Sequence, residues 1–198
     1  LFTNRQDLRS RAIGRAAAGS DARMSGCDLP VIINSGSGNQ GMTASLPVLT
    51  YAEELQVGEE KTYRALALSN LLTIHLRSGI GTLSAYCGAV SAGSAAGAAV
   101  CWLQGGDYDA IAHTLVNSLA IVSGIICDGA KPSCAAKIAC AVDAGLFGWE
   151  MYQNGQQFFG GDGIVEKGVE NTIRNVSRLG RDGMRQTDDE IVKIMIEC

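Results

Sequence analysis

The chain has 198 residues and a formal net charge of −4 at pH 7. This length allows one domain with a sizeable core, so we expect residues 1–198 to form a single domain. The acidic balance, without a basic stripe, argues against nucleic acid as a partner. Only 6% of the residues are aromatic while 25 are Gly, a composition that favours helices packed closely through small side chains.

The spacing of apolar residues predicts a chain that is almost wholly helical. Strand patterns are nearly absent, and no internal repeat or long linker divides the chain. We therefore expect an all-α fold, a compact bundle around a buried small-residue helix, with an apolar run at 29–34 and a Gly-rich loop at 35–41. The expected helices cover residues 3–23, 46–56, 58–77, 85–103, from Asp107 or Asp109 to 126, from Pro132 or Ser133 to 152, 164–179 and 188–196.

Residues with special backbone roles support several of these boundaries. Pro47 suits the first turn of the helix over 46–56, where its missing N–H would have no helical partner. The helix over 58–77 starts with acidic residues and ends with Arg77, as the helix dipole favours. Gly79 can close that helix.

Residues 78–106 contain no charged side chain. A run of about 20 apolar residues can span a bilayer. This run consists of Ala, Gly and Ser more than of Leu, Ile and Phe, so its insertion into a membrane would be weak. The glycines along it favour a helix buried on all sides, with a membrane helix pair as the less favoured alternative.

The chain contains seven cysteines, an odd number that makes a poor disulfide framework. No apolar signal-peptide segment follows the first residues, so we expect a reducing cytoplasm, where clustered cysteines more often bind metal or act in catalysis. Because the chain starts at Leu1 and not at Met, we expect it to be a piece of a longer protein. The cysteines are Cys27, Cys87, Cys101, Cys127, Cys134, Cys140 and Cys198.

Three of these, Cys87, Cys127 and Cys134, lie among small residues that let a bulky group approach the backbone. Cys127 and Cys134 flank a turn with Gly129 and Pro132, which can bring both sulfurs to one face. Cys87 and Cys134 lie near expected helix starts, where N–H groups stabilise thiolates. Three thiolates would suit an iron–sulfur cluster with one iron open for chemistry. The spacing matches no standard ferredoxin or zinc pattern, so inert buried thiols stay the alternative.

Lys131 and Lys137 would add positive charge beside an anionic cluster. The other cysteines are weaker candidates for metal ligands. Cys101 and Cys140 lie within expected helices and are interpreted as packing residues. The role of Cys27 stays open.

The most loop-like stretch of the first half is Ser35-Gly36-Ser37-Gly38-Asn39-Gln40-Gly41. Its glycines allow successive backbone N–H groups to point into one concavity, and its hydroxyl and amide side chains add donors. Such a loop can bind a carboxylate, with a flexible turn as the alternative. Phosphate is less favoured because no Gly-Lys-Ser or Gly-Lys-Thr follows.

Two motifs can be compared with known families. Cys127-Asp-Gly-Ala-Lys-Pro-Ser-Cys134 follows Cys87 after forty residues, and the second motif is Asn34-Ser-Gly-Ser-Gly-Asn-Gln-Gly-Met-Thr-Ala-Ser-Leu-Pro47. Together they resemble the L-cysteine desulfidase family, which is related to the alpha domain of bacterial iron–sulfur L-serine dehydratases. The resemblance covers essentially the whole chain, and the motifs are specific jointly rather than singly.

The resemblance implies an oxygen-sensitive [4Fe–4S] cluster held by three cysteines, at positions that match Cys87, Cys127 and Cys134. It implies a lyase for β-elimination of L-cysteine to pyruvate, ammonia and sulfide, with serine dehydratase-type deamination of L-serine as the alternative. It also implies an N-terminal region that nothing in this chain matches, so this C-terminal part would be inactive alone. The residues expected to bind the amino-acid substrate are Ser35, Gly36, Ser37, Gly38, Asn39, Gln40 and Lys131. For Lys131, a side chain that only faces solvent is the alternative.

Some roles stay open at this level. The general base is unresolved, because His75 and His113 are the only histidines and both lie in helical patterns. Cys198 carries a thiol beside a free carboxylate, as the substrate does, and would act as an internal ligand of the open iron, with a frayed terminus as the alternative. Small apolar surfaces make a homodimer reasonable. A non-catalytic helical module that binds a small anion is the competing function.

Overall fold

The computed structural model describes residues 7–81 and 84–197. In these ranges the chain is all-α, with isolated β-bridges only, so the predicted fold class is confirmed. No helix within them has both the length and the apolar character needed to cross a membrane. The helical elements are α1 (Leu8–Met24), α2 (Gly38–Glu54), α3 (Glu59–Ser78), α4 (Gly88–Leu103), α5 (Tyr108–Val122), α6 (Cys134–Gln153), α7 (Val169–Arg178), the π-helical turn η1 (Leu179–Gly183) and α8 (Arg185–Glu197).

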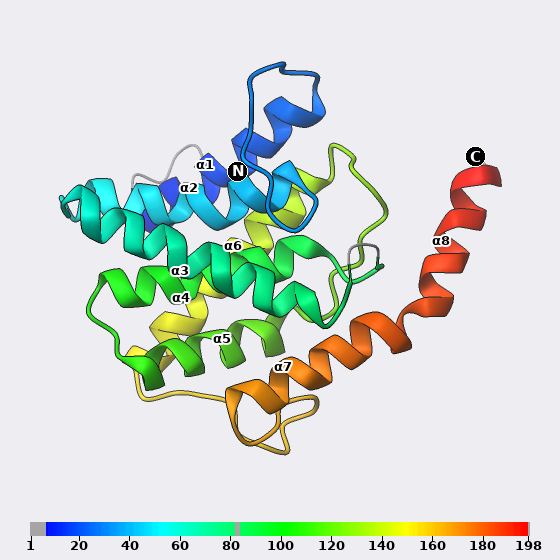
Figure 1. The fold of residues 1–198 in the computed structure, drawn as a ribbon. Coiled ribbons are helices and arrows are strands. Elements are labelled where there is room, and N and C mark those ends of the chain that lie inside the picture. The colour runs from blue at the N-terminus through cyan, green and yellow to red at the C-terminus, as the bar shows by residue number, and fades with distance from the viewer. Residues whose placement is uncertain (1–6, 82–83, 198) are drawn as a thin grey trace.

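Helix α4 lies in the middle of the bundle, and α2, α3, α5 and α6 pack around it (Figure 1). Every residue of α4 from 89 to 101 is buried, as its uniformly small and apolar sequence predicts. A Cβ atom on Gly93 would lie 2.5 Å from the carbonyl oxygen of Ala141 in α6. Small residues therefore let α4 and α6 cross with their backbones almost in contact.

Helix α1 covers one side of this pair and packs against α2 and α6. Its N-cap Asp7 accepts a 2.9 Å hydrogen bond from the N–H of Ser10, which satisfies one of the free donors of the first turn. Arg9 donates to the Asp143 carboxylate of α6 at 2.8 Å. The predicted start of this helix, Thr3, lies outside the described residues.

Helix α2 differs most from the sequence prediction, because it begins at Gly38 and not at Leu46. Only residues 35–37 form a turn, and the remaining part of the expected loop is the first turn of the helix. A Cβ atom on Gly41 would lie 1.8 Å from the carbonyl oxygen of Ile32. The glycines here allow close packing within a helix, whereas their low helix propensity predicted a loop.

Pro47 consequently lies inside α2, and its expected place in the first turn is wrong. The helix tolerates it without the hydrogen bond that residue 47 would donate to the Thr43 carbonyl. Burial compensates for this loss, because most of α2 from Gly38 to Ala52 is inaccessible to solvent.

Two predicted helix boundaries, the start of α4 and the end of α5, differ from the structure because of one β-bridge. Helix α4 starts three residues later than expected and α5 ends four residues earlier, because Tyr86 and Ile126 pair as an antiparallel bridge. Both flanking segments are therefore extended where helix was predicted. Helix α7 starts at Val169, five residues later than expected, after Gly168 with φ +89°.

The predicted C-terminal helix is present as α8, which projects from the bundle beyond α7 and η1 (Figure 1). None of its residues is buried. Cys198 lies outside the described residues.

Candidate functional site

One cavity of about 300 Å³ gathers the three cysteines and most of the Gly-rich segment. This volume is at the lower end of the range of small-molecule pockets, about 300–1,000 Å³. Its walls come from the N-terminal ends of α2, α4 and α6 and from the last turns of α1 and α3. The described lining residues are Arg23, Ser35, Gly36, Ser37, Asn39, Gln40, Arg77, Ser84, Tyr86, Cys87, Gly88, Ala89, Cys127, Gly129, Ala130, Cys134, Lys137 and Ile138.

Cys87 and Cys127 are held side by side by backbone hydrogen bonds. The N–H of Cys127 donates to the carbonyl of Ala85 at 2.7 Å, and the N–H of Cys87 donates to the carbonyl of Ile125 at 3.3 Å. This short antiparallel pairing brings together two thiols that are forty residues apart in the chain.

Cys134 completes the set as the first residue of α6. The turn before it passes through Gly129 at φ +95°, a conformation that favours glycine. The N–H of Lys131 donates to the sulfur of Cys134 at 3.4 Å. The structure therefore places all three predicted thiols at one cavity, and their role as metal ligands stays a prediction.

The thiols of Cys87 and Cys127 differ in their affinity for a proton. The pKa of Cys127 is lowered to about 6, chiefly because the Cys87 thiol donates a hydrogen bond to its sulfur, with help from the N–H of Gly129 and the charge of Lys137. The same hydrogen bond, together with burial, raises the pKa of Cys87. The pair therefore releases its first proton more readily than its second, and a bound metal would have to displace both.

Three helix N-termini point their partial positive charge at this cavity. Ser37 is the N-cap of α2, Cys87 is the N-cap of α4, and Cys134 is the first residue of α6. The free N–H groups of these first turns favour thiolates and carboxylates.

Cationic side chains add to this field. Arg77 is only 5% exposed and donates to the carbonyl of Tyr86 at 3.1 Å; its burial lowers its pKa. Lys137 pairs with Asp128, which raises the pKa of Lys137 although partial burial opposes the effect. Arg23 donates a 3.0 Å hydrogen bond to Oδ1 of Asn39 in α2. Among the described lining residues none is acidic, so the cavity is electropositive.

The Gly-rich segment supplies the opposite wall. Asn34 and Ser37 exchange backbone hydrogen bonds of 3.2 and 3.0 Å, and the amide of Asn34 donates to Asn70 of α3 at 2.8 Å. These bonds fix the turn that carries the predicted substrate-binding residues. Gly38 is the exception, because a Cβ atom there would meet Val31 at 2.5 Å and not the cavity.

Other predicted residues lie elsewhere. Lys131 is exposed on the turn and is not among the lining residues, which include Lys137 instead. Cys27 and Cys140 are exposed, and Cys101 is fully buried outside the cavity. The suggested internal ligand, Cys198, lies outside the described residues.

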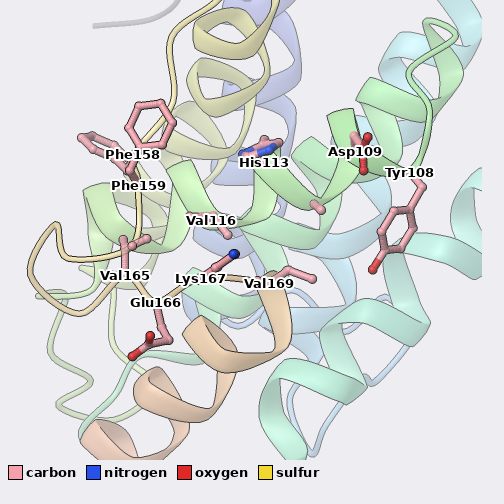
Figure 2. A pocket seen from close by; sticks show the side chains of 13 residues that line it. Tyr108, Asp109, His113, Val116, Phe158, Phe159, Val165, Glu166, Lys167 and Val169 are labelled. Carbon is pink, nitrogen blue, oxygen red and sulfur yellow. The ribbon is translucent and has the colours of Figure 1, made fainter.

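Neither histidine lies at the cysteine cavity. His75 contacts Glu170 at 3.0 Å on the outer surface. Figure 2 shows His113 in a second cavity of about 290 Å³ between α5, α7 and the segment with Phe158, which shares no described lining residue with the first. His113 stacks on Tyr152 with ring centroids 5.3 Å apart.

Arg23 and Arg77 were missed in the sequence. A signal for Arg77 was present, because Ser69, Thr73 and Arg77 recur every fourth residue, and all three are buried on one face of α3. Arg23 stands at the end of an Arg-rich helix, and nothing in the sequence distinguishes it from its neighbours.

The lining residues fit a cluster better than a single ion. Within residues 7–81 and 84–197, no three His, Cys, Asp or Glu side chains converge as ligands of one metal ion. An iron–sulfur cluster takes each thiolate on a different iron, so its ligands need not converge on one point. Three thiols, free N–H donors and cations suit a sulfur-ligated group of negative charge.

Comparisons with known proteins identify the family. The family described as serine dehydratase alpha chain matches residues 5–193. A UPF0597 protein of Desulfitobacterium hafniense (strain Y51) is 67% identical over 99% of this chain and 46% of its own length. A UPF0597 protein of Lachnoclostridium phytofermentans is 56% identical over 96% of this chain and 46% of its own length. No solved structure matches the chain.

The chain thus spans about half the length of the curated relatives it matches. The family match covers nearly all of it, including both cysteine segments and the Gly-rich segment. The predicted relation to the alpha domain of iron–sulfur serine dehydratases is confirmed: the chain belongs to the serine dehydratase alpha chain family.

Proposed function

We propose that the chain forms the cluster-binding part of an iron–sulfur lyase that removes the β-substituent of a small L-amino acid. The observation that carries this proposal is the meeting of three thiols and three helix N-termini at one cavity. The motif resemblance favours L-cysteine as the substrate, and the family description favours L-serine.

Cys87, Cys127 and Cys134 would hold a [4Fe–4S] cluster. When bound, the cluster supplies a Lewis-acidic iron for the leaving sulfur or oxygen. The N–H groups of Ala89 and Gly129, which point at the sulfurs of Cys87 and Cys127, stabilise these thiolates.

The substrate carboxylate is assigned to the turn at 35–37 and the N-terminus of α2, where free N–H groups can surround an anion. Arg23 lies beside this turn and donates to Asn39 at 3.0 Å, which holds that amide at the cavity wall. These groups would orient the substrate and would neutralise its charge.

The reaction breaks the Cα–H bond and the Cβ–S or Cβ–O bond, releasing sulfide or water, and hydrolysis of the resulting enamine gives pyruvate and ammonia. The proton needs an acceptor. Because both histidines lie away from the cysteine cavity, we assign the acceptor to the N-terminal region implied by the resemblance. This chain alone would then bind the cluster without turnover.

The first experiment is anaerobic reconstitution of the chain with iron and sulfide. We expect about four irons per chain, and their loss when Cys87, Cys127 or Cys134 is replaced by Ala. Cys140→Ala is the matched control, because this exposed thiol lies in α6 outside the cavity. Iron uptake that survives all three cavity substitutions would overturn the cluster assignment.

The second experiment measures pyruvate release by a protein that also carries the N-terminal region. Sulfide release from L-cysteine or pyruvate from L-serine identifies the leaving group. An iron-loaded protein that releases pyruvate from neither amino acid would overturn the lyase proposal.

A further inference from the structure

Gln40 carries a buried acceptor at the wall of the cysteine cavity. It lies in the first turn of α2, and its side chain is only 7% exposed. Its Nε2 donates to the carbonyl of Ser35 at 3.4 Å. Its Oε1 is buried and has no hydrogen-bond partner among the described residues. Rotating the amide by 180° would place two oxygens together, so the contact with Ser35 identifies Oε1 as the atom left without a partner.

Gly88 permits this position of the amide. A Cβ atom on Gly88 would lie 2.4 Å from Cδ and 2.7 Å from Oε1 of Gln40. The amide therefore lies against the backbone at the start of α4, next to Cys87. Close approach of α2 and α4 at this point holds the amide at the residue that follows Cys87.

This oxygen is a hydrogen-bond acceptor, whereas most groups around the cavity are donors. The helix N-termini, Arg23, Arg77 and Lys137 are all donors, and they suit the anionic parts of a ligand. A buried carbonyl oxygen without a partner is costly and calls for an explanation. A ligand that has a hydrogen-bond donor as well as a negative group would satisfy both kinds of site at once.

We infer that Gln40 accepts a hydrogen bond from the α-ammonium group of the ligand, so that the cavity selects α-amino acids over the corresponding acids without an amino group. The sequence assigned Gln40 to carboxylate binding as a donor, whereas this inference gives its oxygen the role of an acceptor. The inference rests on the proposed function for the choice of an amino acid as ligand. Gln40 is a specificity residue and takes no part in bond breaking.

L-Alanine and propionate test the inference, because they differ only in the ammonium group and neither has a β-leaving group. Their dissociation constants are measured by calorimetry on the iron-loaded protein under anaerobic conditions. We expect wild type to bind L-alanine about tenfold to a hundredfold more tightly than propionate, the range for a hydrogen bond to a charged group. Gln40→Leu removes the acceptor and should bring this ratio close to one.

Gln40→Glu is the matched variant, because it keeps an acceptor of the same size. It should retain or increase the preference for L-alanine, and equal iron content in all variants shows that the site is intact. General damage would weaken both ligands alike and leave the ratio unchanged.

An unchanged ratio in Gln40→Leu, or a wild type without preference, would overturn the inference and leave Oε1 as a site for water alone. Binding does not require turnover in this assay. If the preference for L-alanine is preserved but the protein that also carries the N-terminal region releases no pyruvate from L-cysteine or L-serine, the lyase proposal fails and the role of Gln40 stands.

Discussion

Gly97 and Gly145 lie against each other where α4 crosses α6, so that a Cβ atom on Gly97 would lie 2.3 Å from the carbonyl oxygen of Gly145. In the same crossing, a Cβ atom on Gly145 would lie 2.2 Å from the carbonyl oxygen of Gly93. The crossing fixes the relative orientation of two helices whose N-terminal ends carry Cys87 and Cys134. Packing in the core therefore sets the positions of two thiols at the cavity.

Gly145→Ala should destabilise the fold, because its methyl group would meet backbone that cannot move independently. Overpacking of this kind costs about 1–3 kcal/mol in the free energy of unfolding, which urea denaturation measures. Gly14→Ala in α1 is the control, because a Cβ atom there meets nothing within 4 Å. It should raise stability by about 0.5–1 kcal/mol through helix propensity. Equal effects of the two substitutions would contradict the close crossing.

The sequence predicted the central helix well and the start of α2 poorly, for one physical reason. Small residues over 85–103 suit a buried helix whatever packs around it, so local pattern and tertiary structure agree. In residues 38–41 the glycines predict a loop, but contact with the segment at Ile32 and burial against the bundle make this stretch helical. Single-sequence propensity carries no information on such a contact.

In the candidate site too, some residues could be predicted from the local sequence and others depend on tertiary contacts. The cysteines and the Gly-rich segment stand out in the sequence because they are unusual locally. Lys131 and Lys137 are equally close to Cys134 in the chain, and the helical phase of α6 brings only Lys137 to the cavity. Arg77 reaches the cavity through the packing of α3 on α4, which depends on tertiary structure.

Asn117→Ala should loosen the segment that forms one wall of the second cavity (Figure 2). Asn117 is fully buried; its Nδ2 donates to the carbonyl of Gly148 at 3.1 Å, and its Oδ1 accepts from the N–H of Phe158 at 3.1 Å. Truncation removes both hydrogen bonds and leaves the partly buried N–H of Phe158 without this acceptor, at a cost of about 0.5–1.5 kcal/mol for each hydrogen bond. Thermal unfolding and limited proteolysis after residue 153 measure the effect.

Asn154→Ala is the control for that experiment. Its side chain is exposed and donates to the carbonyl of Glu150 at 2.8 Å. We expect a change within about 0.5 kcal/mol, as for most surface substitutions. If Asn154→Ala destabilised the protein as much as Asn117→Ala, the anchoring role of Asn117 would be wrong.

Asp107→Ala should shorten or destabilise α5. The Asp107 carboxylate accepts a 2.9 Å hydrogen bond from the N–H of Ala110, so it caps the helix as one of the two predicted candidates. Loss of an N-cap costs about 1 kcal/mol, measurable as a lower urea midpoint. Asp107→Asn keeps the oxygen acceptor and should stay close to wild type; a drop of the same size would assign the effect to charge instead of capping.

Gly88→Ala should change ligand selection much more than stability. The new methyl group would meet the amide of Gln40, which is the end of a flexible side chain and can move aside. The displaced Oε1 would no longer face the ligand, so the preference for L-alanine over propionate should fall several-fold while iron content and melting temperature stay near wild type. Gly124→Ala is the matched control, because a Cβ atom there meets nothing within 4 Å. A preference that persists in Gly88→Ala would show that the amide does not need its place against α4 to select the ammonium group.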